Sequence, residues 1–238
     1  MTPEEWLEMR VKAYNSAHGD KYPCDECLGR GTIAFIEDGE MRVRLCRCEV
    51  KRRNMNRVKR SGLGEMFENC RMDNFDTNYD WQKVIKEKAM EYIYSGGGWY
   101  LLCGRAGSGK THLTAAIARE MLLAGRETRY FMWREDAPRL KAIVNDAERY
   151  DERMRELTDC SVLLIDDLFK GKVTDADVNL AFEMLNARYN SPSKRTVIST
   201  EKTAEELLQL DEAVGSRILE RSRGYILQTG DVNLRLGG

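Results

Sequence analysis

Short apolar runs and longer amphipathic stretches alternate along the chain from Asp80 onward. The apolar runs have the length of buried strands, and the stretches between them carry apolar residues at helical spacing. We therefore expect strands at 99–103, 128–133, 161–167, 195–200 and 225–229, and helices at 80–94, 110–122, 138–144 and 147–157. The run Val162–Ile165 is purely apolar, which suits a central parallel strand covered on both faces. This alternation predicts an α/β fold with a parallel sheet flanked by helices.

The first 79 residues follow a different pattern, which predicts a smaller unit. An apolar run at Thr32–Ile36 and an alternating run at Met41–Leu45 flank Asp38-Gly39, a turn sequence typical of a β-hairpin. A basic stretch at Lys51–Arg60 follows and is compatible with a helix. The expected organisation is an N-terminal domain at 1–60, a linker at 61–79 and the α/β domain at 80–238.

The chain is highly charged but nearly neutral, with 32% charged residues and a formal net charge of −1. This balance gives no global field that would direct the protein to nucleic acid or to a membrane surface. The local distribution is uneven, because nine Lys or Arg and a single acid, Glu49, lie between Arg42 and Arg60. That segment is either a solvated cationic helix or a contact for DNA phosphates or an acidic partner.

No segment of the sequence resembles a signal peptide or a membrane span. The N-terminus, MTPEEWLEMR, lacks a cationic start and an apolar core, and no apolar run approaches about 20 residues. We therefore expect a cytoplasmic protein with no membrane partner. The stretch 1–22 contains Trp6 and is either a partner-binding helix or a segment packed on its own domain.

Four of the seven cysteines cluster around the predicted hairpin. The pairs Cys24/Cys27 and Cys46/Cys48 are joined by 18 residues, and a hairpin between them returns the second pair to the first. Four thiolates can then surround one Zn²⁺ at about 2.3 Å, in a structural site with no open position. A spacing of one residue between Cys46 and Cys48 is less usual than two, so an Fe–S cluster or unmetallated thiols stay open as alternatives.

The segment GRAGSGKT follows the strand expected at 99–103 and precedes a helical pattern, which is the context of a phosphate-binding loop. Glycines turn backbone N–H groups toward the phosphates, and the helix N-terminus adds positive potential. Lys110 can reach the β- and γ-phosphates, and the Thr111 hydroxyl can ligate Mg²⁺. The alternative is a glycine-rich turn without a ligand. The expected nucleotide contacts are Gly104, Arg105, Ala106, Gly107, Ser108, Gly109, Lys110, Thr111 and His112.

Two carboxylates, Asp166 and Asp167, end the strand expected at 161–167. Ligands bind at the carboxyl ends of parallel strands, so both should lie beside the phosphate loop. We assign Asp166 to the Mg²⁺ shell, through water, and Asp167 to orienting and activating the attacking water. The alternative is an N-cap for the next helix.

Two further features supply candidate catalytic side chains. Ser199 or Thr200, at the end of the strand expected at 195–200, is placed to contact the attacking water or the γ-phosphate. Arg217 and Arg221 lie one helical turn apart, and an arginine that reaches a neighbouring subunit's γ-phosphate would neutralise charge in the transition state. On spacing alone, these arginines also fit a solvated basic helix end.

In this order, GRAGSGKT, VLLIDDLFKGKV, TVIST and VGSRILERSRG resemble the AAA+ helicase loaders of the DnaC/DnaI type, including phage versions. The similarity also covers the cysteine-rich segment ending CRCEVKRRN and the linker, so it spans most of the chain. The resemblance implies an ATP-dependent switch that engages the hexameric replicative helicase through its N-terminal region and helps place it on single-stranded DNA. It also implies self-association, with ATP between neighbouring AAA+ domains.

The resemblance assigns roles to particular residues. Arg217 matches the arginine finger, and Thr200 (or Ser199) matches the first sensor. The segment Met72–Thr77 resembles the one that packs near the adenine. Basic residues that fall where the family's DNA-facing helix lies are Arg134, Arg139 and Lys141. Only 15 residues follow Arg223, so we expect no full C-terminal lid, a less enclosed nucleotide, and slow turnover that depends on assembly.

Other functions remain possible from the sequence. A transposition-accessory ATPase of the IstB type shares the core, although the cysteine-rich segment and the DDLFKGKV stretch favour the loader. A third possibility is a zinc-dependent DNA-binding module whose ATP site only maintains structure. A metabolic kinase is disfavoured by the paired acids and the arginine helix, since phosphate-loop kinases need a substrate-binding lid.

Overall fold

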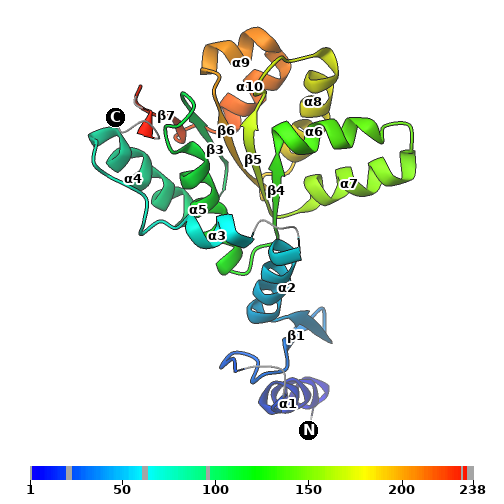
Figure 1. The fold of residues 1–238 in the computed structure, drawn as a ribbon. Coiled ribbons are helices and arrows are strands. Elements are labelled where there is room, and N and C mark those ends of the chain that lie inside the picture. The colour runs from blue at the N-terminus through cyan, green and yellow to red at the C-terminus, as the bar shows by residue number, and fades with distance from the viewer. Residues whose placement is uncertain (1, 20–22, 61–63, 95–96, 232, 235–238) are drawn as a thin grey trace.

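A five-stranded parallel sheet forms the centre of the larger domain in this computed structural model, which describes residues 2–19, 23–60, 64–94, 97–231 and 233–234 (Figure 1). The strand order is β4-β5-β6-β3-β7. The strands are β3 (Trp99–Cys103), β4 (Thr128–Met132), β5 (Val162–Leu168), β6 (Arg195–Thr200) and β7 (Ile226–Gln228). The sheet confirms the α/β fold that the alternating pattern predicts.

The two faces of the sheet are covered by different helices, because alternate strand residues point to opposite sides. On one face Leu102 and Val197 pack against α4 (Asp80–Tyr94) and α5 (Lys110–Leu123). On the other face Leu101 and Ile198 belong to a second core with the remaining helices. Those helices are α6 (Trp133–Ala142), α7 (Ala147–Asp159), α8 (Asp175–Tyr189), α9 (Ala204–Leu210) and α10 (Glu212–Arg221). Burial on both faces explains the continuous apolar runs of the strand sequences.

The boundary predicted between the second strand of the sheet and the helix that follows it is wrong. The second strand ends at Met132, and α6 already begins at Trp133, five residues before the predicted start at Pro138. The Asp136 carboxylate accepts a 2.8 Å hydrogen bond from the Met132 N–H, which satisfies a backbone donor at the helix start. Pro138 lies inside the helix, where its ring lacks the donor for one backbone bond.

The N-terminal residues form a small separate unit below the sheet in the view of Figure 1. The expected hairpin is present as β1 (Thr32–Glu37) and β2 (Glu40–Leu45), in antiparallel register. Helix α1 (Pro3–Ser16) lies against it, because the Asn15 amide bonds both the N–H and the C=O of Ala34 at 2.9 Å. Trp6 in α1 is 45% exposed, with the Arg10 guanidinium over its ring.

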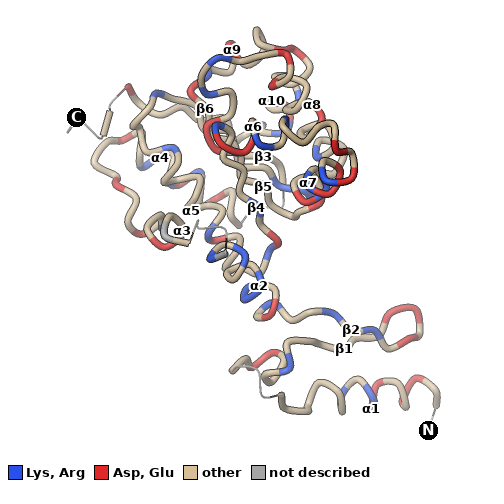
Figure 2. Tube along the Cα trace, turned by 45° about the vertical axis from the view of Figure 1, so that its right-hand side comes forward, with Lys and Arg blue, Asp and Glu red and all other residues tan. Residues whose placement is uncertain are grey.

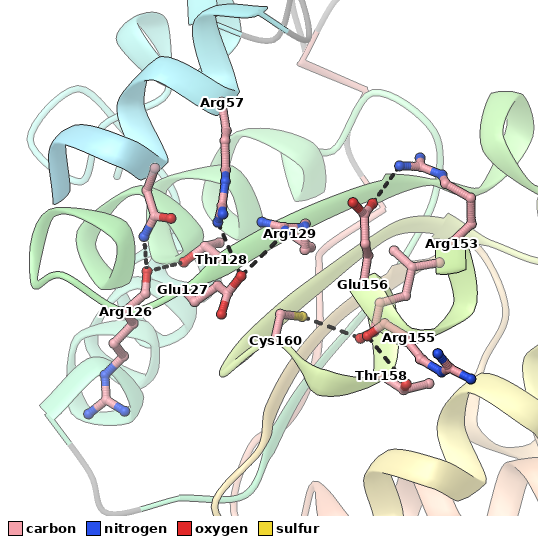
Figure 3. A network of polar contacts seen from close by, with 12 residues as sticks. Arg57, Arg126, Glu127, Thr128, Arg129, Arg153, Arg155, Glu156, Thr158 and Cys160 are labelled. Atoms are coloured by element: carbon pink, nitrogen blue, oxygen red, sulfur yellow. Dashed lines mark hydrogen bonds and ion pairs between the residues drawn. The ribbon is translucent and has the colours of Figure 1, made fainter. Parts of the chain in front are cut away.

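Helix α2 (Arg47–Arg60) joins this unit to the larger domain. It begins four residues before the predicted basic helix, so Cys48 is part of it. Val58 belongs to the same core as α5, and the buried Asn54 amide donates to the Arg126 carbonyl. Its exposed cations form a blue band between the two units (Figure 2). Figure 3 shows how Arg57 meets Glu127, which also pairs with Arg129 of β4.

The segment after α2 is also packed on the α/β domain. Helix α3 (Gly64–Asn69) contributes the buried Phe67 to the core beside α5. Met72 and Phe75 follow in the same core. Among the helices in the described ranges, none is both long enough and apolar enough to cross a bilayer.

Candidate nucleotide and metal sites

The phosphate loop connects β3 to α5 with the conformation that glycine allows. Gly104 has φ +148°, and a Cβ built there would lie 1.8 Å from the Thr229 hydroxyl, so no other residue fits without a shift. Gly109 is the N-cap of α5 in the left-handed region and supplies no side-chain cap. The first N–H groups of α5 are therefore left for a bound anion.

Lys110 lies over the loop. Its ammonium donates to the carbonyls of Gly104 and Arg105, both at 2.8 Å. Burial lowers the pKa of Lys110. The Ser108 hydroxyl is buried and donates to the Arg105 carbonyl at 2.9 Å, which also holds the loop. A cavity of about 290 Å³ opens beside the loop, and the residues lining it are Asp76, Ala106, Gly107, Gly109, Lys110, Thr111, His112, Asp167, Lys170 and Leu234.

The Asp166 carboxylate, 4% exposed, is the centre of a cluster of hydroxyl groups. The Thr111 hydroxyl donates to it at 3.2 Å, and the Ser199 hydroxyl donates to the same oxygen. The Tyr130 hydroxyl donates to the other oxygen at 2.8 Å. The structure thus brings together the two residues expected at Mg²⁺, Thr111 and Asp166. It adds Tyr130, a contact that the sequence analysis missed.

The two sensor candidates have different surroundings. Ser199 contacts both acids, because its hydroxyl also accepts the Asp167 N–H at 2.8 Å. Thr200 instead donates to the Leu168 carbonyl at 2.8 Å and accepts the Lys202 N–H at 3.1 Å. Of the two residues that the sequence left open, Ser199 is therefore the one that contacts the Asp166 carboxylate, and the sensor role stays a prediction.

Asp167 lines the cavity with an unusual backbone. Its φ is +57°, a left-handed conformation that a non-glycine residue adopts only at a cost. Its carboxylate accepts a 2.8 Å bond from Lys170, which also pairs with Glu201 at 3.1 Å. Burial lowers the pKa of Lys170, but the bonds to Asp167 and Glu201 outweigh it and raise the value. The sequence analysis gave Lys170 no role, and its position three residues after Asp167 is the signal that could have identified it.

The linker segment expected near the adenine lies beside the start of α5. His112 Nε2 is 3.0 Å from Asn74 Oδ1 and 3.2 Å from the Arg71 carbonyl. The His112 ring meets the Phe75 ring edge to face at 5.6 Å between centroids. The segment therefore borders the phosphate loop, and its contact with the adenine stays a prediction.

Arg217 and Arg221 lie on the other side of the sheet from α5. Arg217 donates to Asn186 at 3.0 Å and to the Ala213 carbonyl at 2.8 Å, with its guanidinium over the Phe182 ring. Arg221 donates to the Pro192 carbonyl at 3.2 Å. Within the described residues, neither arginine forms a hydrogen bond or ion pair with the phosphate loop of its own chain.

The three basic residues expected to face DNA are only partly available. Arg134 and Arg139 are exposed on α6. Lys141 instead donates to Asp177 of α8 at 2.6 Å, a contact that ties two helices together. A DNA contact by these residues stays a prediction.

The four clustered cysteines come together at the base of α2. Their sulfur atoms all lie within 4.8 Å of one another, with 3.8 Å from Cys24 to Cys46 and 3.5 Å from Cys27 to Cys48. A tetrahedron with Zn–S bonds of about 2.3 Å has sulfurs about 3.8 Å apart, so this donor set fits zinc.

The surroundings act on the clustered thiols in different directions. The Gly31 N–H donates to Cys27 Sγ at 3.2 Å. Burial acts to raise the pKa of Cys27, but this bond and those from the neighbouring thiols lower it to about 7. Burial raises the pKa of Cys46 to about 11. A cation bound between the four sulfurs would favour the thiolate form of each cysteine.

A strand–loop–helix phosphate loop and acids at the end of a neighbouring parallel strand define a P-loop nucleotide-binding protein of the AAA+ fold. Residues 33–235 match the family described as IstB-like ATP binding protein, and the chain belongs to this family.

Curated relatives include phage-element proteins and helicase loaders. Bacillus subtilis YqaM, described as uncharacterized, is 35% identical over 211 residues, which cover 81% of this chain. The match spans 66% of the length of YqaM, just under two thirds. The Bacillus subtilis phage-like element PBSX protein XkdC is 29% identical over 222 residues (87% and 82%). The Escherichia coli replicative helicase loader DnaC is 25% identical over 193 residues (79% and 77%).

Solved structures show the same fold. The DnaC helicase loader aligns with a TM-score of 0.59 at 20% identity, over 69% of this chain and 98% of that one. DnaI aligns with a TM-score of 0.54 at 23% identity, over 71% and 92%. The replication initiator DnaA bound to AMPPCP and single-stranded DNA aligns with a TM-score of 0.60 at 19% identity, over 69% and 51%.

Proposed function

We propose that this protein is an ATP-dependent helicase loader, which binds the hexameric replicative helicase and helps deposit it on single-stranded DNA. The observation that carries the proposal is the Thr111–Asp166–Ser199 cluster beside a phosphate loop, in a chain related to DnaC. Its setting would be the cytoplasm, where replication of bacterial and phage DNA takes place.

The ATP site would work through the residues around the cavity. Lys110 would leave the carbonyls of Gly104 and Arg105 to bind the β- and γ-phosphates. Thr111 and Asp166 would hold Mg²⁺, which supplies charge neutralisation when bound. Asp167 would orient the attacking water and accept its proton once Lys170 turns to the phosphates or to Glu201.

Hydrolysis would need a second copy of the chain. The Arg217 guanidinium donates hydrogen bonds to Asn186 of α8 and to the Ala213 carbonyl of α10, so it cannot reach the nucleotide site of its own chain without moving. In an assembly it would reach the γ-phosphate of a neighbouring subunit and stabilise the transition state. Turnover would therefore be slow for the isolated chain and faster on assembly.

The N-terminal unit would contact the helicase. Zinc held by the four cysteines would fix the hairpin and the start of α2, because a unit this small has little core of its own. The exposed Trp6 on α1 is a candidate contact for the helicase.

The test is the mass of the purified chain mixed with its replicative helicase, with and without Mg·ATP. We expect a defined complex that changes with ATP, and Lys110→Ala should remove the change. Asp167→Asn should bind ATP without turning it over, and mixing it with Arg217→Ala should restore part of the turnover. Absence of a complex under every nucleotide condition would refute the loader function.

A second candidate function rests on the description of the matching family as IstB-like ATP binding protein. It is a transposition-accessory ATPase that acts on DNA without a helicase. An ATP-dependent complex with DNA, formed in the absence of any helicase complex, would favour this function over the loader.

A further inference from the structure

Tyr130 connects the carboxylate expected at Mg²⁺ to the N-terminal half of the chain. Its hydroxyl donates to Asp166 at 2.8 Å from β4, a strand that supplies no other side chain to that carboxylate. The hydroxyls of Thr111 and Ser199 occupy the other Asp166 oxygen. Each carboxylate oxygen therefore has its own hydrogen-bond donor, which fixes the plane of the group.

The ring of Tyr130 packs against α3, in the segment that follows α2. The Tyr130 ring meets the Phe67 ring of α3 edge to face, with centroids 6.2 Å apart. Both rings, with Arg57 and Val58 of α2, line one cavity of about 260 Å³ between α2, β4 and α7. Phe67 is 3% exposed, so the position of its ring depends on how α3 packs.

We propose that Tyr130 is a positioning residue for Asp166, and that Phe67 sets the Tyr130 ring so that the packing of α3 reaches the Mg²⁺ site. This inference rests on the proposed ATP site. Replacing a residue that hydrogen-bonds to a metal ligand and orients it typically weakens metal affinity by about 10- to 100-fold. The hydroxyl of Tyr130 meets that description, since it touches the ligand and lies outside the lining of the nucleotide cavity.

The experiment measures binding of a fluorescent ATP analogue to the full-length chain as a function of Mg²⁺ concentration. Tyr130→Phe keeps the ring and removes the hydroxyl, and should raise the half-saturating Mg²⁺ concentration about 10-fold. Nucleotide affinity in EDTA should be unchanged. Phe67→Leu should shift the Mg²⁺ requirement in the same direction by a smaller factor, and should add nothing in the Tyr130→Phe background.

Tyr150→Phe is the matched control, because its hydroxyl also donates to a carboxylate, Glu183, at 2.6 Å, between α7 and α8. It should leave the Mg²⁺ requirement unchanged. A wild-type requirement in Tyr130→Phe would overturn the inference, and an additive effect of Phe67→Leu would overturn the link to α3. Nucleotide binding by the wild-type chain that does not depend on Mg²⁺ would also overturn the inference, whereas a wild-type chain that binds no nucleotide at all would refute the proposed ATP site itself.

Discussion

Replacing Ser199 with alanine tests whether the Ser199 hydroxyl, rather than that of Thr200, supports Asp166 and Asp167 in the nucleotide site. The Ser199 side chain is fully buried, donates to the Asp166 carboxylate and accepts the Asp167 N–H. Ser199→Ala leaves a buried carboxylate short of one donor and a backbone N–H without its acceptor. A hydrogen bond to a charged group contributes about 1.5–3 kcal/mol, and an orphaned buried donor costs about 1–3 kcal/mol. We expect a loss of about 3 kcal/mol in the free energy of unfolding.

Thr200→Val is the control, because it removes a hydroxyl from the next residue without touching either acid. Its two bonds are to neutral backbone groups, so we expect a loss of about 1–2 kcal/mol. The two variants then differ in their response to nucleotide. Urea unfolding with and without Mg·ATP measures that response, since a ligand that binds the folded state stabilises it.

We expect Thr200→Val to keep the full stabilisation by Mg·ATP. Ser199→Ala should lose about 1.4 kcal/mol of it, which corresponds to tenfold weaker binding. The assignment of Ser199 to the nucleotide site would be refuted if Ser199→Ala kept the full stabilisation by Mg·ATP and Thr200→Val lost it. The sensor role would then belong to Thr200.

Three other outcomes can be checked separately. Lys110→Ala should abolish the rise in melting temperature that Mg·ATP gives the wild-type chain, while the chain without nucleotide stays folded; an undiminished rise would exclude Lys110 from the phosphate site. Zinc chelation should unfold the N-terminal unit, which would be seen as a loss of near-ultraviolet circular dichroism from Trp6. Zinc binding should weaken as the pH falls, because the thiolates are protonated. An unchanged spectrum after complete removal of the metal would contradict a structural zinc. Hydrogen bonds from Arg52, then Arg53, lower the pKa of Glu49 to about 2. The stabilising contribution of Glu49 is therefore full above pH about 4.5 and is lost as the pH falls toward 2. Glu49→Gln should make the free energy of unfolding less dependent on pH in that window, and an unaltered dependence would show that the pairing contributes nothing.

The elements that sequence predicts well are those whose pattern has a single physical cause. β6 occupies the predicted residues 195–200, and β3 the predicted residues 99–103. β3 reads WYLLC, an apolar run that suits a strand buried on both faces. The cysteine cluster follows from the hairpin, since Asp38-Gly39 fixes where the chain turns back.

The details that sequence leaves open depend on register and on contacts between distant segments. Ser199 and Thr200 point to opposite faces of the sheet, so only the pairing of Ile165 with Ile198 shows which of them lies beside Asp166. Tyr130 reaches Asp166 from another strand, 36 residues away in the chain. No local pattern at Tyr130 distinguishes this contact from that of an ordinary strand tyrosine.

Helix α2 makes the two units of the chain mechanically continuous. Its first turn contains Cys48, one of the four clustered cysteines, and its far end places Val58 in the core of the larger domain. A 14-residue helix is about 21 Å long and stiff over that distance. A force on the N-terminal unit is therefore transmitted by a helix rather than absorbed by a flexible linker. Because α2 and α3 contact each other and α3 carries Phe67, a displacement of α2 would act on the packing that surrounds Tyr130 and Asp166.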